Sequence, residues 1–321
     1  MLAPATPPNT GYAVAFDVHR AQKGVTFWTK REESHLAYFR KLRAKGYDHV
    51  GLVFEPRGWM EGRAGEVANF RLVRARIKDA LDAGLLVVVR TMPWAMNMTA
   101  MWDQKDPAHF DPWLVPFART IAQFDSNRVA WEFLSEPGWF TRETSKLGVD
   151  LDRQRELGTE FLHRVWAHTV PLIRRYAPKH TLFLGLPGWG HSYGANEHLL
   201  VQTGRYSNVV HFFHFYWPMD FTHDQTGTLS WPEQNWKEKL RGKDINTIDF
   251  AADRKPWTQS GLDYELDKLA QWRNQRGVPI FITEMGPVHN KDLPAGKRYR
   301  QALEAGLRAR NIPYSIWLGE T

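Results

Sequence analysis

Short apolar runs and longer amphipathic stretches alternate along almost the whole chain. Eight of the runs have the length of a β-strand and are apolar over most of their length rather than alternating, at residues 24–29, 48–54, 85–91, 129–135, 181–186, 209–216, 278–283 and 314–318. Continuous apolar character is typical of strands in a parallel sheet, because both faces of such a sheet are covered. The pattern therefore predicts eight buried parallel strands.

Stretches with helical periodicity separate these runs, at residues 32–44, 66–83, 112–124, 152–176, 261–276 and 294–308. Several end at a glycine that can close a helix in the left-handed conformation, as at Gly46, Gly84 and Gly277. This alternation predicts an α/β fold, a single-domain (β/α)8 TIM barrel over residues 1–321. An open doubly wound sheet is the alternative, but the sequence lacks the glycine-rich turn that follows the first strand of such a sheet.

Three segments depart from this alternation. Residues 1–10 are rich in alanine, proline and threonine and predict a flexible N-terminal segment. They do not have the pattern of a signal peptide but resemble the start of a mature exported protein, so we expect a periplasmic or extracellular location. Residues 10–19 are expected to form a small hairpin or a plug at the barrel floor. Residues 217–258 form a long polar excursion that predicts a cleft wall.

Composition narrows the classes of function. The net charge of +7 comes from lysines and arginines that are scattered among acidic residues, which predicts a solvated basic surface and no nucleic-acid partner. No apolar run reaches the roughly 18 to 20 residues of a membrane span, so no membrane-spanning segment is predicted. The absence of cysteine excludes disulfides, thiolate catalysis and cysteine-ligated metals.

The thirteen histidines do not have the spacing of a metal site. His211 and His214 are three residues apart on a predicted strand, so their side chains should face opposite sides. His163 and His168 are five residues apart on a predicted helix, which is a poor spacing for one site. We therefore predict neither a metal nor a cofactor.

Two glutamates follow the apolar runs of the fourth and seventh predicted strands. Glu136 lies in WEFLSEP and Glu284 in PIFITEMGP. Functional groups of a parallel barrel gather at the carboxyl ends of its strands, and strands four and seven face each other. Two carboxylates about 5 to 5.5 Å apart are the apparatus of a retaining glycosidase. Each glutamate alone could instead cap a helix or pair with an arginine, but together they predict a catalytic pair.

Fifteen tryptophans are more than a core of this size requires, and many lie beside turn residues. Indole rings have flat apolar faces on which sugars stack, although they also fill gaps between helices and loops. We predict that the substrate contacts polar and aromatic residues at strand ends, namely Arg57, Trp94, Trp139, Trp189, Trp217 and His223.

Six segments in order along nearly the whole chain resemble glycoside hydrolase family 5, the cellulase-like barrels: KGVTFWT, KGYDHVGLVF, WEFLSEP, HFFHFYWPMDFTHD, PIFITEMG and SIWLGET. The most specific is HFYWPMDFTH. The resemblance implies that Glu136 is the acid/base and Glu284 the nucleophile. It also implies that Tyr216 lies near the nucleophile, that His214 lies near the acid/base, and that Trp317 is the platform under the reacting sugar.

Three positions depart from the family pattern. The strand-two arginine is replaced by Gly51, the histidine after strand three falls near Met92, and the asparagine before the acid/base is Ser135. Because that asparagine binds the sugar 2-hydroxyl, we predict an altered −1 subsite and a substrate such as a 2-linked glucan. Arg57 or Arg90 is expected to replace the missing arginine from a neighbouring position.

The leading hypothesis is a retaining, endo-β-glucanase-like glycoside hydrolase or a transglycosylase, which acts by double displacement on an oligo- or polysaccharide, a β-glucan or a related β-linked chain. A non-catalytic glycan-binding barrel is the first alternative. An unrelated metal-dependent barrel hydrolase is the second, and the histidine spacing disfavours it.

Overall fold

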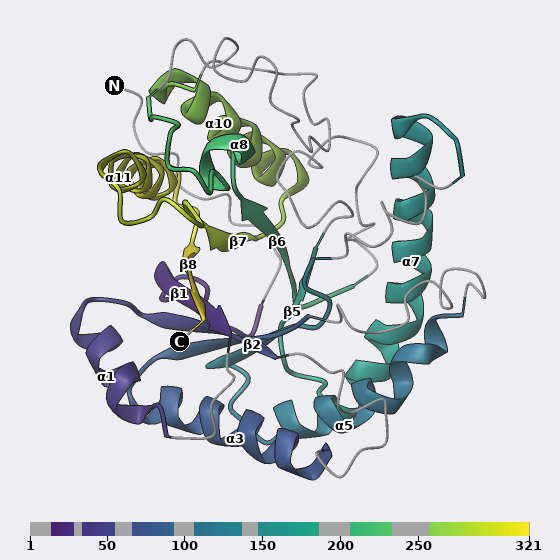
Figure 1. Ribbon diagram of the computed structural model, residues 1–321. Helices are drawn as coiled ribbons and strands as arrows, with labels where there is room; N and C mark the ends of the chain where they lie inside the picture. Colours follow the sequence, from purple (N-terminus) through teal and green to yellow (C-terminus); the bar gives the residue numbers. More distant parts are fainter. Residues whose placement is uncertain are drawn as a thin grey trace.

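In the computed structural model, eight parallel strands close into one barrel in the order β1 to β8 (Figure 1). The structure describes residues 14–28, 34–54, 66–92, 106–136, 147–185, 206–232 and 257–320. The predicted single-domain (β/α)8 TIM barrel is confirmed. The predicted flexible segment 1–10 lies outside the described residues, as do residues 233–256 of the predicted cleft wall.

The strands lie where the apolar runs predict them, with ends that differ by a few residues. All residues of β2 to β7 are buried, as expected for strands covered on both faces. The bounds are β1 (Lys23–Trp28), β2 (His49–Phe54), β3 (Leu86–Thr91), β4 (Val129–Glu132), β5 (Leu182–Leu184), β6 (Val209–Phe215), β7 (Ile280–Met285) and β8 (Tyr314–Glu320).

Helices surround the barrel (Figure 1), with α1, α3 and α5 together on one side, α7 next to them, and α10 and α11 on the opposite side. Among the described helices, none combines the length and the apolar character needed to cross a membrane. The bounds are α1 (Leu36–Ala44), α3 (Glu66–Asp82), η1 (Pro107–Phe110), α5 (Asp111–Ile121), α7 (Leu151–Tyr176), α8 (Met219–Thr222), α10 (Gln259–Arg276) and α11 (Pro294–Ala309).

The helical segment predicted over 112–124 begins earlier, with the 3-10 turn η1 in front of α5. The reason is local, because the Asp106 side chain accepts a hydrogen bond from the Ala108 amide and Pro107 occupies the first position of the turn. At the other end of the chain, Gly277 ends α10 in the left-handed conformation, at φ 64°.

Side chains that point into the barrel form two layers of different chemistry. The floor is apolar and is closed by Phe16, which confirms the predicted plug and packs with a cluster that includes Val88, Ala130 and Phe212. Side chains alternate along a strand, so the next inward position on each of these strands is two residues further. Those positions carry Arg90, Glu132 and His214, all buried. The barrel therefore holds a charged layer directly above its apolar floor.

Candidate active site

Arg90 is the centre of the charged layer. Its Nε donates to Oε1 of Glu132 over 2.9 Å, and its Nη1 donates to Oε1 of Glu284 over 2.7 Å. Nη1 also donates to Oγ1 of Thr26 over 3.0 Å. Burial disfavours the charge of Arg90, but the two carboxylates outweigh this effect and raise its pKa. Arg90 is therefore a fixed cation that faces two acidic side chains.

Glu132, the last residue of β4, balances that cation. Burial by itself would raise the pKa of Glu132, but the charge of Arg90 outweighs it and lowers the pKa to about 2. One guanidinium thus faces two carboxylates, Glu132 and Glu284. Glu132 therefore shares the positive charge of Arg90 with Glu284.

The second amino group of Arg90 holds two further residues. Nη2 donates to Oγ of Ser135 over 2.6 Å and lies 2.8 Å from Nε2 of His214. Both residues are completely buried. Arg90 thereby connects the segment after β4, which carries Glu136, with β6.

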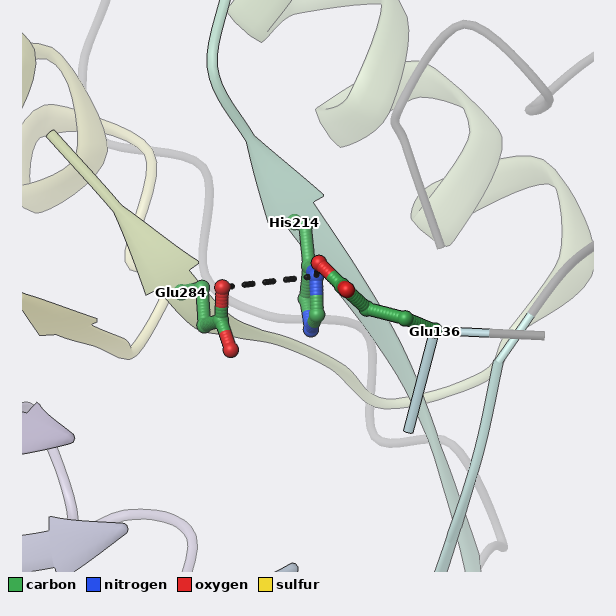
Figure 2. A group of neighbouring side chains, drawn as sticks. All are labelled: Glu136, His214 and Glu284. Carbon is green, nitrogen blue, oxygen red and sulfur yellow. Dashed lines mark hydrogen bonds and ion pairs between the residues drawn. The ribbon is translucent and has the colours of Figure 1, made fainter. Parts of the chain in front are cut away.

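Glu136 and Glu284 meet across the barrel mouth, with the imidazole of His214 between them (Figure 2). Nδ1 of His214 lies 3.0 Å from Oε1 of Glu136 and 3.6 Å from Oε2 of Glu284. One carboxylate oxygen from each glutamate and a ring nitrogen of His214 all lie within 4.8 Å of one another. This separation is close to that of paired carboxylates in retaining glycosidases.

Glu136 has an unusual backbone and a modified acidity. Its φ of 50° is in the left-handed region, which few non-glycine residues adopt and which occurs often at functional sites. Burial raises the pKa of Glu136, the hydrogen bond from His214 opposes this, and the nearby charge of Glu284 raises it further. A carboxyl group with a raised pKa can stay protonated near neutral pH and act as a general acid.

Tyr216 holds the other oxygen of the nucleophile candidate. Its hydroxyl donates to Oε2 of Glu284 over 2.7 Å. Burial and the charge of Glu284 raise the pKa of Tyr216 well above 10, so the phenol stays a donor. The Tyr216 carbonyl accepts a hydrogen bond from Thr222 in α8, and Val288 in the loop after β7 donates to the Thr222 carbonyl. These bonds connect the loops after β6 and β7.

Gly51 lies beside the buried part of Arg90. The Cβ of a larger residue at this position would overlap Oγ1 of Thr26 and lie 2.8 Å from its Cβ and 3.4 Å from Cδ of Arg90. The hydroxyl of Thr26 also donates to the Gly51 carbonyl. In the family that the sequence resembles, an arginine occupies this position on strand two. Here the side chains of Thr26 and Arg90 thus occupy the corresponding space. Of the two arginines expected as replacements, Arg57 lies outside the described residues.

The remaining predicted substrate residues have different surroundings. Trp317 on β8 is half-buried. His223 packs edge-on against Tyr216 with ring centroids 5.1 Å apart, and burial lowers its pKa. Trp217 is only 7% exposed and packs against Trp231, so most of its ring belongs to the core. The other predicted tryptophans, Trp94, Trp139 and Trp189, lie outside the described residues.

Sequence reasoning missed two members of the site, Thr26 and Glu132. Each lies inside a predicted apolar run, 24–29 or 129–135, rather than at its end. A charged residue in a strand that is otherwise buried is a signal that could have revealed Glu132, because a buried charge needs a partner. Thr26 gives no comparable signal.

The spacing of Glu136, His214 and Glu284 is also one that could hold a cation. Each of the three already makes a hydrogen bond within the site: Glu136 with His214, and Glu284 with Arg90 and Tyr216. We therefore interpret the cluster as a proton-transfer site.

A closed parallel barrel with two carboxylates facing each other at the ends of β4 and β7 has the architecture of the barrel glycoside hydrolases. The sequence profile of cellulase (glycosyl hydrolase family 5) matches residues 10–320, and the chain therefore belongs to this family. No curated protein sequence matches the chain.

Solved structures share the fold at low sequence identity. Cel5A of Thermotoga maritima in complex with cellobiose has a TM-score of 0.69 at 18% identity, over 95% of this chain and 91% of that one. The cellulose synthase subunit Z of Clostridioides difficile has a TM-score of 0.64 at 17% identity, over 94% and 92%. A broad-specificity endoglucanase of Clostridium acetobutylicum has a TM-score of 0.66 at 15% identity, over 94% and 88%.

Proposed function

We propose that this protein is a retaining glycoside hydrolase of a β-linked glucan, with Glu136 as the acid/base and Glu284 as the nucleophile. The observation that carries the proposal is the pair of facing carboxylates, whose nearest oxygens lie within 4.8 Å of each other. That distance leaves no room for the water molecule that an inverting enzyme holds between sugar and base. Family membership and the fold are consistent with this chemistry.

The first step exchanges one bond at the anomeric carbon for another. A carboxylate oxygen of Glu284 attacks that carbon and forms an ester, while the bond to the leaving oxygen breaks. Glu136 gives its proton to that oxygen, for which its raised pKa is suited. Arg90 and Tyr216 hold the two oxygens of Glu284 in place during the attack.

The second step returns the enzyme to its starting state. Glu136, now a carboxylate, takes a proton from water as the water oxygen attacks the anomeric carbon and the ester to Glu284 breaks. A sugar hydroxyl in place of water would give a new glycosidic bond, so transglycosylation uses the same groups. The product keeps the anomeric configuration of the substrate in both cases.

We further propose that the subsite for the reacting sugar is altered. Ser135 stands immediately before the acid/base, and its hydroxyl oxygen already accepts a hydrogen bond from Arg90. It has no amide to offer to a sugar 2-hydroxyl. This supports a substrate in which the 2-position is linked or substituted, such as a β-1,2-glucan. Solved relatives in complex with cellobiose and mannotriose support a β-linked chain as the general class.

The test is a panel of β-1,2-, β-1,3-, β-1,4- and β-1,6-glucans, incubated with the wild type and with the Glu136→Gln and Glu284→Gln variants. We expect products from the wild type alone, with retained anomeric configuration by proton NMR and masses that separate hydrolysis from transfer. Inverted products, or activity that survives Glu284→Gln, would contradict the mechanism. Glucan binding without any product would instead identify a non-catalytic glycan-binding barrel.

A further inference from the structure

The hydrogen-bonding capacity of Arg90 is completely used. A guanidinium has five N–H donors and no acceptor. The Nε hydrogen goes to Glu132, and the two Nη1 hydrogens go to Glu284 and Thr26. The two Nη2 hydrogens go to Ser135 and to Nε2 of His214. The last of these bonds requires a lone pair on the histidine nitrogen.

We propose that Arg90 is a positioning residue that fixes His214 as the neutral tautomer with its hydrogen on Nδ1, which donates to Glu136 throughout the reaction. The proposal rests on the proposed function, because it assigns the acid/base role to Glu136. It adds a second task to Arg90, which also holds the nucleophile.

The geometry around Nε2 is the main support. Nη2 of Arg90 lies 2.8 Å from Nε2 of His214, and two N–H groups directed at each other cannot share that distance. Oε1 of Glu132 lies 3.9 Å from Nε2, beyond hydrogen-bonding reach. Nδ1 lies 3.0 Å from Glu136 and is therefore the nitrogen that carries the hydrogen.

The carboxylates around His214 favour its protonated form, whereas the contact with Arg90 favours the neutral form. Burial lowers the pKa of His214, but the carboxylates of Glu284, Glu132 and Glu136 would together raise it to about 9. An imidazolium would place a second cation against Arg90 inside the barrel, with no acceptor between them. We infer that the direct contact with Arg90 prevails and that burial and Arg90 keep the imidazole neutral.

A neutral imidazole has a consequence for the acid/base. His214 donates to Oε1 of Glu136 whether that carboxyl is protonated or not, which leaves Oε2 to carry the proton. An imidazolium at the same place would stabilise the carboxylate and lower the pKa of Glu136. By excluding that cation, Arg90 preserves the raised pKa that a general acid needs.

The tautomer can be read directly by nitrogen NMR of wild-type protein labelled with 15N-histidine, with His214 assigned by comparison with His214→Gln. We expect a pyrrole-type shift for Nδ1 and a pyridine-type shift for Nε2, both unchanged from pH 6 to pH 8. Two pyrrole-type nitrogens near pH 7, or a hydrogen on Nε2 alone, would overturn the proposal. This measurement needs no substrate, so it stays informative if the proposed function fails.

The Arg90→Lys variant tests the coupling. It keeps the positive charge beside the carboxylates but has no second amino group to occupy Nε2. We expect His214 to gain a proton in this variant, and the alkaline limb of the kcat profile to move down by about 1 pH unit. Arg174→Lys is the matched control, because Arg174 contacts backbone carbonyls of His180, Ser207 and Asn208.

Each result with the Arg90→Lys variant either supports or contradicts the proposal. A lower alkaline limb together with a protonated His214 in Arg90→Lys, and neither change in Arg174→Lys, supports the proposal. An unchanged tautomer in Arg90→Lys would show that Arg90 does not set it. If Arg90→Lys does not fold, the NMR titration of the wild type decides alone.

Discussion

Gly51 and Arg90 are neighbours inside the barrel, and the small size of one makes room for the other. The Cβ of an alanine at position 51 would lie 3.4 Å from Cδ of Arg90 and would overlap the hydroxyl of Thr26. That hydroxyl is itself an acceptor for Arg90. The absence of a side chain at position 51 therefore controls where the guanidinium lies, and with it both carboxylates that it holds.

We predict that Gly51→Ala lowers stability and activity together. The added methyl group must displace Thr26, at a cost of about 1–3 kcal/mol for an overpacked core, and the movement carries Arg90 away from Glu284. Urea unfolding and kcat measure the two effects. Gly24→Ala on the same side of the barrel is the control, because its methyl group would overlap the ring of His49 at the barrel floor. A loss of kcat as large in Gly24→Ala would mean that general destabilisation explains both.

Glu132→Gln should weaken the fold and slow the reaction. It leaves Arg90 with one carboxylate partner, and breaking a buried ion pair costs about 3 kcal/mol. In the wild type, Glu132 contributes stability at pH values above 4.5, and this contribution is lost as the pH falls toward its folded pKa of about 2. The acid limb of unfolding free energy should thus be flatter in the variant.

Glu304→Gln is a suitable comparison for Glu132→Gln. Glu304 pairs with Lys23 and Arg308 away from the carboxylate pair. The Glu304→Gln variant should be less stable than the wild type, with little change in kcat. An unchanged kcat in Glu132→Gln would show that Arg90 does not need a second carboxylate for its role at Glu284.

Tyr216→Phe should reduce kcat by about 10- to 100-fold. The hydroxyl donates to Oε2 of Glu284, and a hydrogen bond to a charged group contributes about 1.5–3 kcal/mol. Steady-state kinetics on the preferred glucan measure the loss. Tyr299→Phe is the control, because the Tyr299 hydroxyl donates to the backbone carbonyl of Trp217 and should affect stability alone. Equal kcat values for Tyr216→Phe and the wild type would remove Tyr216 from the site.

His211→Phe should stabilise the protein against acid. Among the described residues, neither ring nitrogen of His211 has a hydrogen-bond partner, and burial lowers its pKa from 6.5 to about 3. The unfolded chain therefore binds a proton that the folded protein excludes, so wild-type stability falls as the pH drops from 6.5 toward 3, by at most about 1.4 kcal/mol per pH unit. Unfolding midpoints at pH 5 and pH 7 should differ less in the variant. A pH difference of the same size in both proteins would contradict this account.

The sequence predicted the features that follow from a single physical rule, namely the strands, their two faces and the residues at their ends. Continuous apolar runs specified the eight strands, and the opposite faces expected for His211 and His214 are observed: His211 packs against Trp272 of α10, whereas His214 points between the carboxylates. Glu136 and Glu284 could be predicted because functional groups gather at strand ends.

The partners of Arg90 could not be predicted from the sequence. Five acceptors, which lie on β1, β4, β6 and β7 and directly after β4, meet its guanidinium, and their distances depend on how the barrel closes. The role of Gly51 could not be predicted either, because the space left by its missing side chain matters only next to the side chains that occupy it, Thr26 and Arg90. The predicted helical segment 112–124 starts earlier, at η1, because of a single capping contact of Asp106.

The position of Arg90 on β3 affects how related sequences should be classified. A survey that scores the strand-two arginine column would count this chain as a degenerate homologue, although its guanidinium still binds Glu284 from the neighbouring strand. A glycine in the strand-two block together with an arginine on strand three would mark relatives that share this arrangement. They should be grouped by the three-dimensional place of the cation, and not by the alignment column in which it is written.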